Sequence, residues 1–349
     1  MGKSHHNQVR NARLARGWSQ AELAEKTGIS RTAVSAIEGR RLVPSVAAAL
    51  ALAQAFGTTV EELFGGAAPE APIVWAAESA TPASPAWQAE VSGRLVHYPA
   101  RATPMLTPLA DIQGPALEAG SLAAARASET LVLACCDPAA GLLASLYAQT
   151  TGLRLLVLPR SSSEALELLR QGLVHLAGIH LSTAEEPRRN AQVVRERLGA
   201  GYQLLRMADW QEGIAASPAL KLKSVRAAVR NKLTWIGREP GSGARQCLDR
   251  LLTDRAPRRI ARHHRSVAEA VQAGWADAGI CLQLATAEAG LDFLPVQQES
   301  YEICLANELL GDRRLQALLR VVRSPAYRRV VDDLPGYSSA AAGALEVVP

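Results

Sequence analysis

Downstream of Glu129, the chain alternates short apolar runs with segments whose apolar residues recur every three or four positions. Short apolar runs bounded by turn residues are typical of buried strands, and the amphipathic segments are typical of helices. This alternation predicts a mostly parallel sheet with helices on both faces. The predicted strands are Leu131–Cys135, Leu153–Leu158, Val174–Ile179, Thr234–Gly237 and Ala278–Leu282, and the predicted helices are Pro138–Thr150, Ser163–Gln171, a helix from Ser242 and Ser266–Ala273.

Residues 7–65 have a different pattern, that of short helices in close succession. Ser19 with Glu22 three residues later forms a capping box at the start of one helix. Gly28 allows the positive φ that ends this helix tightly, and Ser30 caps the next one. Val34 and Ile37 lie three residues apart and are expected to face inward. The segment from Trp18 to Gly39 therefore predicts two helices joined by a tight turn.

Two short helices joined in this way make a DNA-reading motif whose second helix enters the major groove. The polar residues left on the outer face of the second helix are candidates for base and phosphate contacts, and Gln20 can bond a phosphate from the start of the first. The two arginines after the second helix suit backbone contacts. The predicted DNA-binding residues are Gln20, Arg31, Thr32, Ser35, Arg40 and Arg41.

This segment resembles the Xre/Cro/phage-repressor helix-turn-helix family. The resemblance covers about a fifth of the chain and implies that the helix after Ser30 reads DNA. A helical bundle that binds protein is the alternative, but it gives Arg31 and Ser35 no reason to be where they are. The matching positions are Arg10, Ser19-Gln20, Leu23-Ala24, Gly28-Ile29-Ser30, Val34-Ser35, Ile37-Glu38-Gly39, Pro44-Ser45 and Glu62-Leu63-Phe64.

Proline divides the chain. Eight of its nineteen prolines fall in residues 67–128, where they interrupt any long helix. Ile73–Ala77 and Arg94–Tyr98 have strand character within this zone. The predicted domains are a helix-turn-helix head at 1–66, a Pro-rich connector with a possible β-hairpin at 67–128, a two-lobed ligand-binding domain at 129–335 and a C-terminal tail at 336–349.

Composition narrows the class of protein. The chain is 48% hydrophobic and 20% charged, which allows a large core and argues against wholesale disorder. Residues 1–66 hold eight Lys and Arg against five acidic residues, and this +3 charge in a small domain favours a polyanionic partner. The five cysteines form no CxxC pair, and no apolar run reaches the length of a membrane span. A cytoplasmic protein is expected.

Two loops connect predicted strands to the helices that follow them: Pro159–Ser163 and Gly237–Arg245. Ligands of open α/β sheets bind beyond the carboxyl ends of the strands. Exposed amides at helix N-termini and serine hydroxyls make an anion site there. Arg238 and Arg245 add positive charge to the second loop. Because such a loop recurs in both α/β halves, ligand binding is favoured over two ordinary helix caps.

The stretch from Leu131 to Leu305 resembles the type 2 periplasmic-binding-protein fold, and more narrowly the molybdate-binding-protein-related domains fused to helix-turn-helix heads. The expected fold is thus an all-α five-helix head followed by an α/β two-lobed domain. The resemblance rests on Cys136–Ala139, Ser161-Ser162, Gly172–Leu181, Arg238–Arg245, Ala270–Gly274, Ala276–Gly279 and Glu299–Tyr301. It implies that Asp137, Ser161, Ser162, Ser242, Asp277 and Tyr301 lie near the ligand, with Arg245 beside them.

Asp137 departs from the pattern of oxyanion binders, which place a small hydroxyl after the first strand. A carboxylate beside a bound dianion costs free energy unless it is paired or protonated. A ligand that carries a donor group fits Asp137 better than bare molybdate or tungstate does. The alternative is that Asp137 only caps the helix that follows Pro138.

The remaining histidines and cysteines predict no metal site and no cofactor. His175 and His180 lie five apart along a predicted strand and so point to opposite faces, which is poor for one metal ion. His263 and His264 lie among arginines and are expected on a solvated basic rim or in a secondary phosphate contact. Cys135 is expected to be buried, and Asp209–Gly213 is expected to begin a loop.

These features predict a ligand-responsive transcriptional regulator whose partners are a double-stranded DNA operator and a small-molecule effector. Two heads of a homodimer would grip half-sites roughly 34 Å apart, one turn of DNA. The first alternative is a constitutive DNA-binding protein with a scaffold domain. The second is an enzyme that uses Cys136 with His175 or His180 as nucleophile and base; no motif fixes their geometry, and no enzymatic activity is expected.

Overall fold

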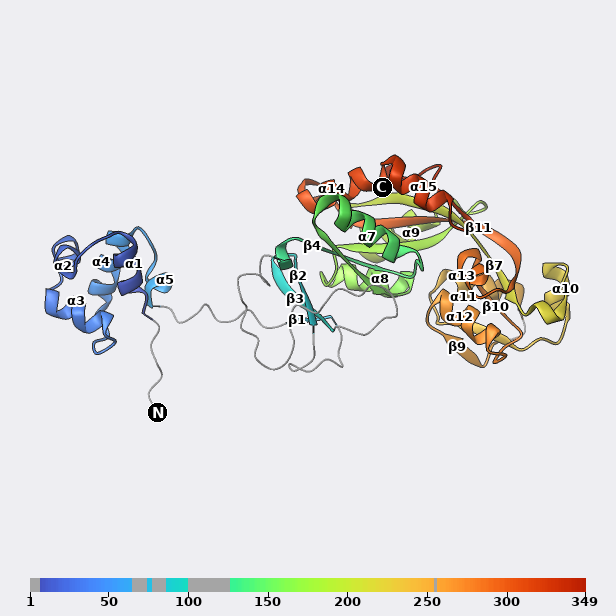
Figure 1. Cartoon of the computed structure of the whole chain (residues 1–349), viewed down its shortest axis with the longest axis horizontal. Coiled ribbons are helices and arrows are strands. Elements are labelled where there is room, and N and C mark those ends of the chain that lie inside the picture. Colours follow the sequence, from blue (N-terminus) through green and yellow to red (C-terminus); the bar gives the residue numbers. More distant parts are fainter. Residues whose placement is uncertain (1–6, 65–73, 77–85, 100–125, 254–255) are drawn as a thin grey trace. The chain divides into compact units, whose positions relative to one another are not determined.

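The computed structural model describes residues 7–64, 74–76, 86–99, 126–253 and 256–349 (Figure 1). The chain divides into two compact units, residues 1–73 and 74–349. Most of the predicted connector, at 67–73, 77–85 and 100–125, lies outside the described residues.

Five helices follow one another in residues 7–64 of the first unit, which confirms the predicted all-helical head. They are α1 (Val9–Ala15), α2 (Gln20–Thr27), α3 (Arg31–Glu38), α4 (Val46–Phe56) and α5 (Val60–Phe64). Their apolar faces meet in one core, which includes Val9, Leu23, Val34, Ile37, Leu52, Phe56 and Leu63.

The turn between α2 and α3 is built as its sequence predicts. The Ser19 hydroxyl accepts a hydrogen bond from the Glu22 amide, and the Glu22 carboxylate accepts one from the Ser19 amide. Gly28 ends α2 with a φ of 67°, and Ser30 caps α3. The capping box and the tight turn are thus confirmed, and they fix the angle at which α3 follows α2.

The second unit is built on one ten-stranded sheet in the order β5-β4-β6-β11-β7-β10-β8-β9, with β12 and β13 also paired to β7. Two 15-residue strands, β7 (Tyr202–Ala216) and β11 (Asp292–Ala306), run antiparallel to each other through its middle. At one end of the sheet, β10 pairs with the downstream half of β7, which lies beside the upstream half of β11. At the other end, β6 pairs with the downstream half of β11. Each long strand therefore belongs to both ends.

Two lobes form around these ends, joined by β7 and β11 (Figure 1). The first lobe is built on β4 (Thr130–Cys135), β5 (Arg154–Pro159) and β6 (Leu176–Thr183). The second is built on β8 (Trp235–Arg238), β9 (Arg259–Ala261) and β10 (Ala278–Leu282). Within each lobe these strands pair in parallel, and the two-lobed α/β fold is confirmed.

Helices cover both faces of the sheet. In the first lobe, alternate residues of β4 enter different cores: Leu131 and Leu133 pack with α7, α14 and α15, while Val132 and Ala134 pack with α8 and α9. None of the described helices is both long and apolar enough to cross a bilayer. The helices are α7 (Ala140–Thr151), α8 (Ser162–Arg170), α9 (Arg189–Leu198), α10 (Val225–Arg230), α11 (Gly243–Leu251), α12 (His264–Gln272), α13 (Gln283–Glu288), α14 (Arg313–Val322) and α15 (Pro325–Asp332).

Two sequence predictions about the sheet are wrong. The sheet is mixed and not mostly parallel, because β7 and β11 pair antiparallel with each other and with their neighbours. Asp209–Gly213 lies inside β7 and begins no loop. This strand does not stand out as an apolar run in the sequence, because it contains polar residues that pair within the sheet. Arg206 pairs with Asp209 at 2.8 Å and with Glu302 of β11 at 3.0 Å.

The predicted tail also joins the sheet. Strands β12 (Tyr337–Ser338) and β13 (Leu345–Val347) pair antiparallel with β7. Short strands of this kind have no periodicity long enough to be seen in sequence. They satisfy backbone groups along the part of β7 that β10 does not reach.

A β-hairpin packs on the first lobe. Strands β2 (Ala86–Val91) and β3 (Arg94–Pro99) pair antiparallel across Ser92 and Gly93, both at positive φ, and β1 (Val74–Trp75) pairs parallel with β3. The predicted strand at 94–98 is present, and the ends of the one predicted at 73–77 lie outside the described residues. The Tyr98 hydroxyl donates to the Leu173 carbonyl at 2.6 Å, so the hairpin belongs to the core of this unit.

His175 ties the hairpin to the sheet. Its Nδ1 accepts a hydrogen bond from the Val132 amide at 3.0 Å, so the ring is neutral and its Nε2 donates to the Glu90 carbonyl at 2.8 Å. Burial lowers the pKa of His175 to about 4, and the charge of Arg314 adds to the effect. The imidazole at this position is therefore structural.

We expect this histidine to make the unfolding free energy fall as the pH drops. Its pKa is about 4 in the folded protein and about 6.5 when unfolded. The unfolded chain therefore binds more protons in this window, and roughly 3 kcal/mol of stability is lost as the pH falls from 6.5 to 4. Urea unfolding of wild type and His175→Asn at several pH values measures it. Equal pH slopes for wild type and His175→Asn would contradict the assignment.

Candidate functional site

The outer face of α3 presents the polar residues predicted to read DNA. Arg31 and Thr32 are exposed and Ser35 is half-buried, whereas Val34 and Ile37 on the other side of the helix are buried. Exposed donors beside a firmly anchored apolar face are what groove reading requires. Arg40, at a φ of 58°, and Arg41 are also exposed just after the helix.

Gln20 has a partner inside the helical unit. Its side-chain amide donates to Glu38 at 2.9 Å, and Glu38 also receives two hydrogen bonds from Arg13, at 2.6 and 3.1 Å. Burial opposes the charge of Glu38, but the bonds from Arg13 and Gln20 outweigh it and lower the pKa of this carboxyl. The Arg13–Glu38 pair holds α1 against α3 and thereby supports the outer face.

The serine turns of the second unit meet each other. The Ser163 hydroxyl donates to the Gly241 carbonyl at 2.8 Å, which joins the start of α8 in the first lobe to the loop before α11 in the second. Gly243 lies against His180, where an added Cβ would come within 2.8 Å of the ring. Only glycine allows this approach, so the two lobes are in direct contact here.

Three of the predicted ligand residues make local contacts, two of them as helix caps and one in an ion pair. Ser161 caps α8 and bonds Glu164, while Ser242 caps α11 and donates to the Glu239 carbonyl. Arg245 pairs with Asp249 on the same helix at 2.8 Å. Each of these side chains is therefore used in a contact within its own turn or helix.

Ser162 differs from them. It is fully buried at the first position of α8, and its hydroxyl has no hydrogen-bond partner among the described residues. A buried hydroxyl without a hydrogen-bond partner costs free energy, and buried polar groups in proteins are rarely left in this state.

Asp137 and Tyr301 lie on the other side of β4. The Asp137 carboxylate accepts from the Ala139 amide at 2.8 Å and from the Tyr337 hydroxyl at 2.7 Å, and burial raises its pKa. Asp137, Tyr301 and Tyr337 line a small cavity of about 20 Å³. The expected N-cap role of Asp137 is wrong, because α7 begins at Ala140 with Ala139 as its N-cap; Asp137 instead bonds the Ala139 amide in the turn before the helix.

Asp277 is not brought to the other predicted residues. It accepts a hydrogen bond from the Thr234 amide at 2.7 Å, at the amino ends of β8 and β10. The loop Gly237–Arg245 follows the carboxyl end of β8, so the length of the strand separates them.

A cluster of buried polar side chains, which sequence reasoning did not assemble, lies at the contact between the lobes. His180 of β6 bonds Glu299 of β11 through Nδ1 at 2.7 Å, and its Nε2 lies 3.0 Å from the sulfur of Cys136. Trp210 donates to Glu299 at 2.9 Å. The Gln297 amide bridges Glu299 and Glu212, at 2.6 and 3.1 Å.

The charges in this cluster are set by these neighbours. Burial alone would lower the pKa of His180, but Cys136 and Glu299 outweigh it and raise that pKa well above its ordinary value. Burial opposes the charge of Glu299, and His180 prevails, so the pKa of Glu299 is lowered. Burial, with the charge of Glu299, raises the pKa of Glu212 well above its ordinary value. These shifts favour the charged forms of His180 and Glu299 and the neutral form of Glu212.

Arg238 and His264 bring the second lobe into the cluster. Arg238 is 1% exposed; it bonds Glu239 and the Arg262 carbonyl, but its Nη1 has no partner among the described residues. The ring of His264 lies 5.6 Å from that of His180, and neither of its nitrogens has such a partner. Burial, with the charges of Arg238 and His180, lowers the pKa of His264 well below its ordinary value.

The expected solvated rim at His263 and His264 is therefore wrong for His264, which is 1% exposed. The inward face of α12 starts at this residue and continues through Val267, Ala268 and Val271. A spacing of three and four residues from His264 to these apolar positions was the available signal.

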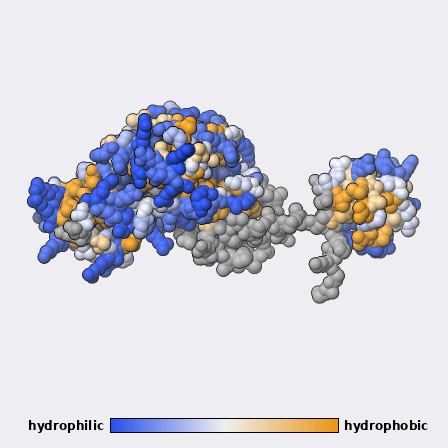
Figure 2. All heavy atoms as spheres, turned by 180° about the vertical axis from the view of Figure 1, so that it is seen from behind, coloured by the Kyte–Doolittle hydropathy of each residue, from blue (hydrophilic) through white to orange (hydrophobic). Residues whose placement is uncertain are grey.

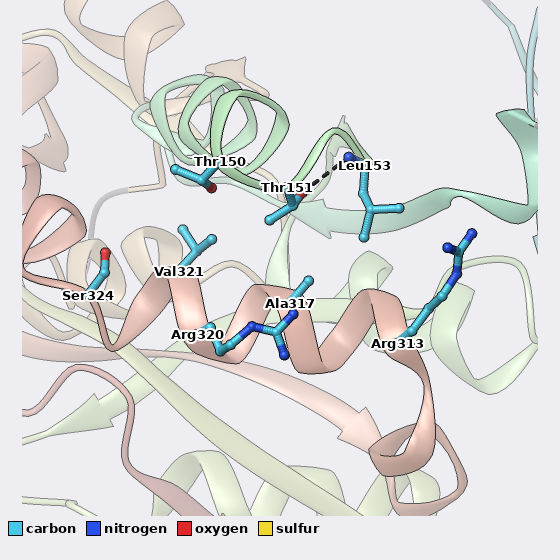
Figure 3. Close-up of a pocket in the computed structure, with 8 residues that line it drawn as sticks. All are labelled: Thr150, Thr151, Leu153, Arg313, Ala317, Arg320, Val321 and Ser324. Atoms are coloured by element: carbon cyan, nitrogen blue, oxygen red, sulfur yellow. Dashed lines mark hydrogen bonds between the residues drawn. The ribbon is translucent and has the colours of Figure 1, made fainter.

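A second, outer pocket of about 480 Å³ lies between the end of α7 and α14 (Figure 3). Thr150 and Thr151 border it from α7, and the side chains of Arg313 and Arg320 extend from α14. It has positive charge, but it contains none of the residues predicted from the sequence.

Comparison with known proteins supports the division of the chain. Residues 9–63 match the helix-turn-helix family. The uncharacterized HTH-type transcriptional regulator YgzD of Bacillus subtilis (strain 168) is 40% identical over 58 residues, which are 17% of this chain and 88% of YgzD.

Residues 143–323, slightly more than half of the chain, match the family described as PBP superfamily domain. The uncharacterized protein YvgK of the same Bacillus strain is 27% identical over 195 residues; this match covers 53% of this chain, and the chain spans only 63% of the length of YvgK.

Similar solved structures include an ABC-type phosphate transport receptor from Vibrio cholerae, at 13% identity and a TM-score of 0.43 over 60% of this chain and 99% of that one. A tungstate ABC transporter from Geobacter sulfurreducens has 16% identity and a TM-score of 0.46 over 59% of this chain and 98% of that one. From the two family matches, the chain belongs to the PBP superfamily domain family and carries an Xre-type helix-turn-helix DNA-binding domain ahead of that domain.

Proposed function

We propose that this protein is a transcriptional regulator that binds operator DNA through α3 and responds to a small anionic molecule held between the two lobes of its second unit. The observation that carries the proposal is a helix-turn-helix domain on the same chain as a buried interlobe cluster with unused hydrogen-bond donors. The regulator acts in the cytoplasm, where its DNA partner is found, and it catalyses no reaction.

An anion is favoured by the kind of groups left unused. Arg238 Nη1 and the Ser162 hydroxyl are donors, and both side chains are buried. Glu212, whose pKa is raised, is a further donor while it is protonated. The helices α8, α11 and α12 begin at the interlobe contact, where their amides and dipoles favour negative charge. Molybdate, tungstate or a related anionic metabolite has this chemistry.

The response requires the lobes to move. The Ser163–Gly241 hydrogen bond and the contact of Gly243 with His180 close the path between the turns, so a ligand enters only when the lobes separate. A ligand that binds the closed arrangement more tightly shifts the equilibrium toward it. Such a shift is the signal that we propose the head reads.

Two other functions remain as rivals. In a constitutive DNA-binding protein, the second unit would be a scaffold and anions would not change DNA affinity. In a thiol enzyme, the 3.0 Å contact of Cys136 with His180, itself oriented by Glu299, would supply nucleophile and base. This second rival rests on that contact.

We also propose that the regulator is a homodimer. The helical unit has exposed apolar side chains (Figure 2), among them Val43, Val46 and Leu50, exposed by 71%, 78% and 56%. Val46 and Leu50 lie four residues apart on α4 and so share a face. Exposed apolar patches commonly mark protein contacts, and a second copy would place two α3 helices on one duplex.

The variant Arg31→Ala is expected to weaken binding to a duplex selected from a random-sequence library by about tenfold or more, since a lost guanine or phosphate contact costs roughly 1–3 kcal/mol. Fluorescence anisotropy measures this and gives the stoichiometry, which should be two chains per duplex. Arg195→Ala is the control, because it removes the same charge from the exposed side of α9. Equal affinity of wild type and Arg31→Ala would contradict the role of α3.

Calorimetric titration with molybdate, tungstate and phosphate is expected to show binding of at least one anion to wild type. Ser162→Ala should weaken that binding by about tenfold, since a hydrogen bond to a charged group contributes roughly 1.5–3 kcal/mol, and Arg238→Gln should weaken it further. Arg320→Gln, in the outer pocket, is the matched control. If Arg320→Gln abolishes binding and Ser162→Ala leaves it unchanged, the anion binds outside the lobes and the proposed site is wrong.

A further inference from the structure

We infer that Cys136, His180 and His264 form a binding site for one transition-metal ion of the Zn²⁺ class, which joins the two lobes. One donor atom from each of these three residues lies within 4.8 Å of the others, and all three residues are buried. This site goes beyond the proposed anion response and does not depend on it.

The spacing of the donors suits such an ion. A Zn²⁺ ion bonds thiolate sulfur at about 2.3 Å and imidazole nitrogen at about 2.0–2.1 Å, which puts two ligands of a tetrahedral site about 3.5 Å apart. Cys136 and His180 are 3.0 Å apart, and the rings of His180 and His264 are 5.6 Å apart between centroids. Small side-chain rotations therefore complete the site.

His264 is the residue that most needs an explanation. Both of its ring nitrogens are buried, and neither has a hydrogen-bond partner among the described residues. Buried imidazoles normally bond to protein or water, because an unpaired polar group costs free energy. Metal ligation gives one of these two nitrogens a partner, and it uses the neutral ring.

The residues around His180 match the outer shell of a metal site. A ligating histidine almost always gives its second N–H to a carboxylate or carbonyl, which fixes the ring and raises its basicity. His180 Nδ1 donates to Glu299 in this way, and Trp210 and Gln297 hold that carboxylate in turn. The nitrogen left for a metal is Nε2, which faces Cys136.

The same contacts disfavour the neighbouring set of His180, Glu212 and Glu299, which also gathers within 4.8 Å. A metal on that side would have to replace the His180–Glu299 hydrogen bond. A thiol nucleophile activated by His180 would leave His264 unexplained. Of these two sets, the one with Cys136 uses Nε2 of His180, which does not bond Glu299, and a ring nitrogen of His264 that has no hydrogen-bond partner among the described residues.

The donor types select the metal. One thiolate with two imidazoles suits Zn²⁺ or Cu⁺, and it does not suit Mg²⁺ or Ca²⁺, which prefer oxygen ligands. Binding displaces the proton of the Cys136 thiol and the Nε2 proton of charged His180, because the thiolate and the neutral imidazole are the ligands. Three protein ligands leave a fourth tetrahedral position, which water or an anion can fill.

The ion would connect parts that move relative to each other. Cys136 follows β4 and His180 lies in β6, both in the first lobe, whereas His264 begins α12 in the second. A metal bound to all three therefore stabilises the closed lobes and is released when they open.

The test is a titration of the full chain, stripped with a chelator, with Co²⁺ followed by competition with Zn²⁺. Wild type should bind one ion per chain and show the absorption of a thiolate–cobalt bond. Cys136→Ser should lose that absorption, and His264→Gln should bind about tenfold or more weakly. Cys281→Ser, a buried cysteine bonded to Thr286, and His263→Gln are matched controls that should bind as wild type does.

Thermal unfolding in chelator shows whether each variant folds, and the wild-type titration decides the question by itself if a variant does not. Absence of stoichiometric Co²⁺ and Zn²⁺ binding to wild type overturns the inference, as does unchanged binding by Cys136→Ser. Iodoacetamide alkylation of Cys136 that saturating Zn²⁺ does not slow also overturns it and favours thiol chemistry. No DNA or anion is present, so a failure here leaves the proposed function standing.

Discussion

The antiparallel pairing of β7 with β11 is the constraint on which the second unit depends. The pairing extends from Asp292 opposite Ala216 to Ala306 opposite Tyr202, with register shifts after Pro295 and Tyr301, so a single ribbon forms part of both lobes. The ribbon also carries Trp210 and Glu212 on one strand and Gln297 and Glu299 on the other. Any change that separates the two strands would therefore separate the lobes and, at the same time, break the contacts of the buried cluster.

Burying carboxylates in the middle of this ribbon is costly unless each is paired or protonated. Glu299 is paired with His180, Glu212 is shifted toward its neutral form, and Gln297 bonds both. Among the described residues, the buried polar atoms without a hydrogen-bond partner include atoms of Ser162, Arg238, His264 and Glu212, and also of Trp235 and Tyr301. Those atoms lie on residues of both lobes and of the ribbon, which is why we place the ligand chemistry at their contact.

Much of this architecture could be predicted from the sequence. The capping box at Ser19, the turn at Gly28 and the apolar runs that became β4, β5 and β10 depend on local chemistry, which a sequence displays directly. The strands β7 and β11 could not be found in this way, because ion pairs such as Arg206–Glu302 satisfy their polar residues across the sheet. The site followed the same division. The turns at Ser161 and Ser242 were visible, whereas His264 and Glu299 come together only through long-range packing, and Asp277 stands at the wrong end of its strand.

The central claim is that small molecules bind in the interior between the lobes. A crystal structure of the full chain grown with molybdate and Zn²⁺ tests it most directly, since both scatter X-rays anomalously. The account predicts anomalous density for molybdate next to Arg238 and Ser162; density for Zn²⁺ next to Cys136, His180 and His264 tests the separate metal inference. Density only in the outer pocket beside Arg313 and Arg320, or none between closed lobes, would contradict it.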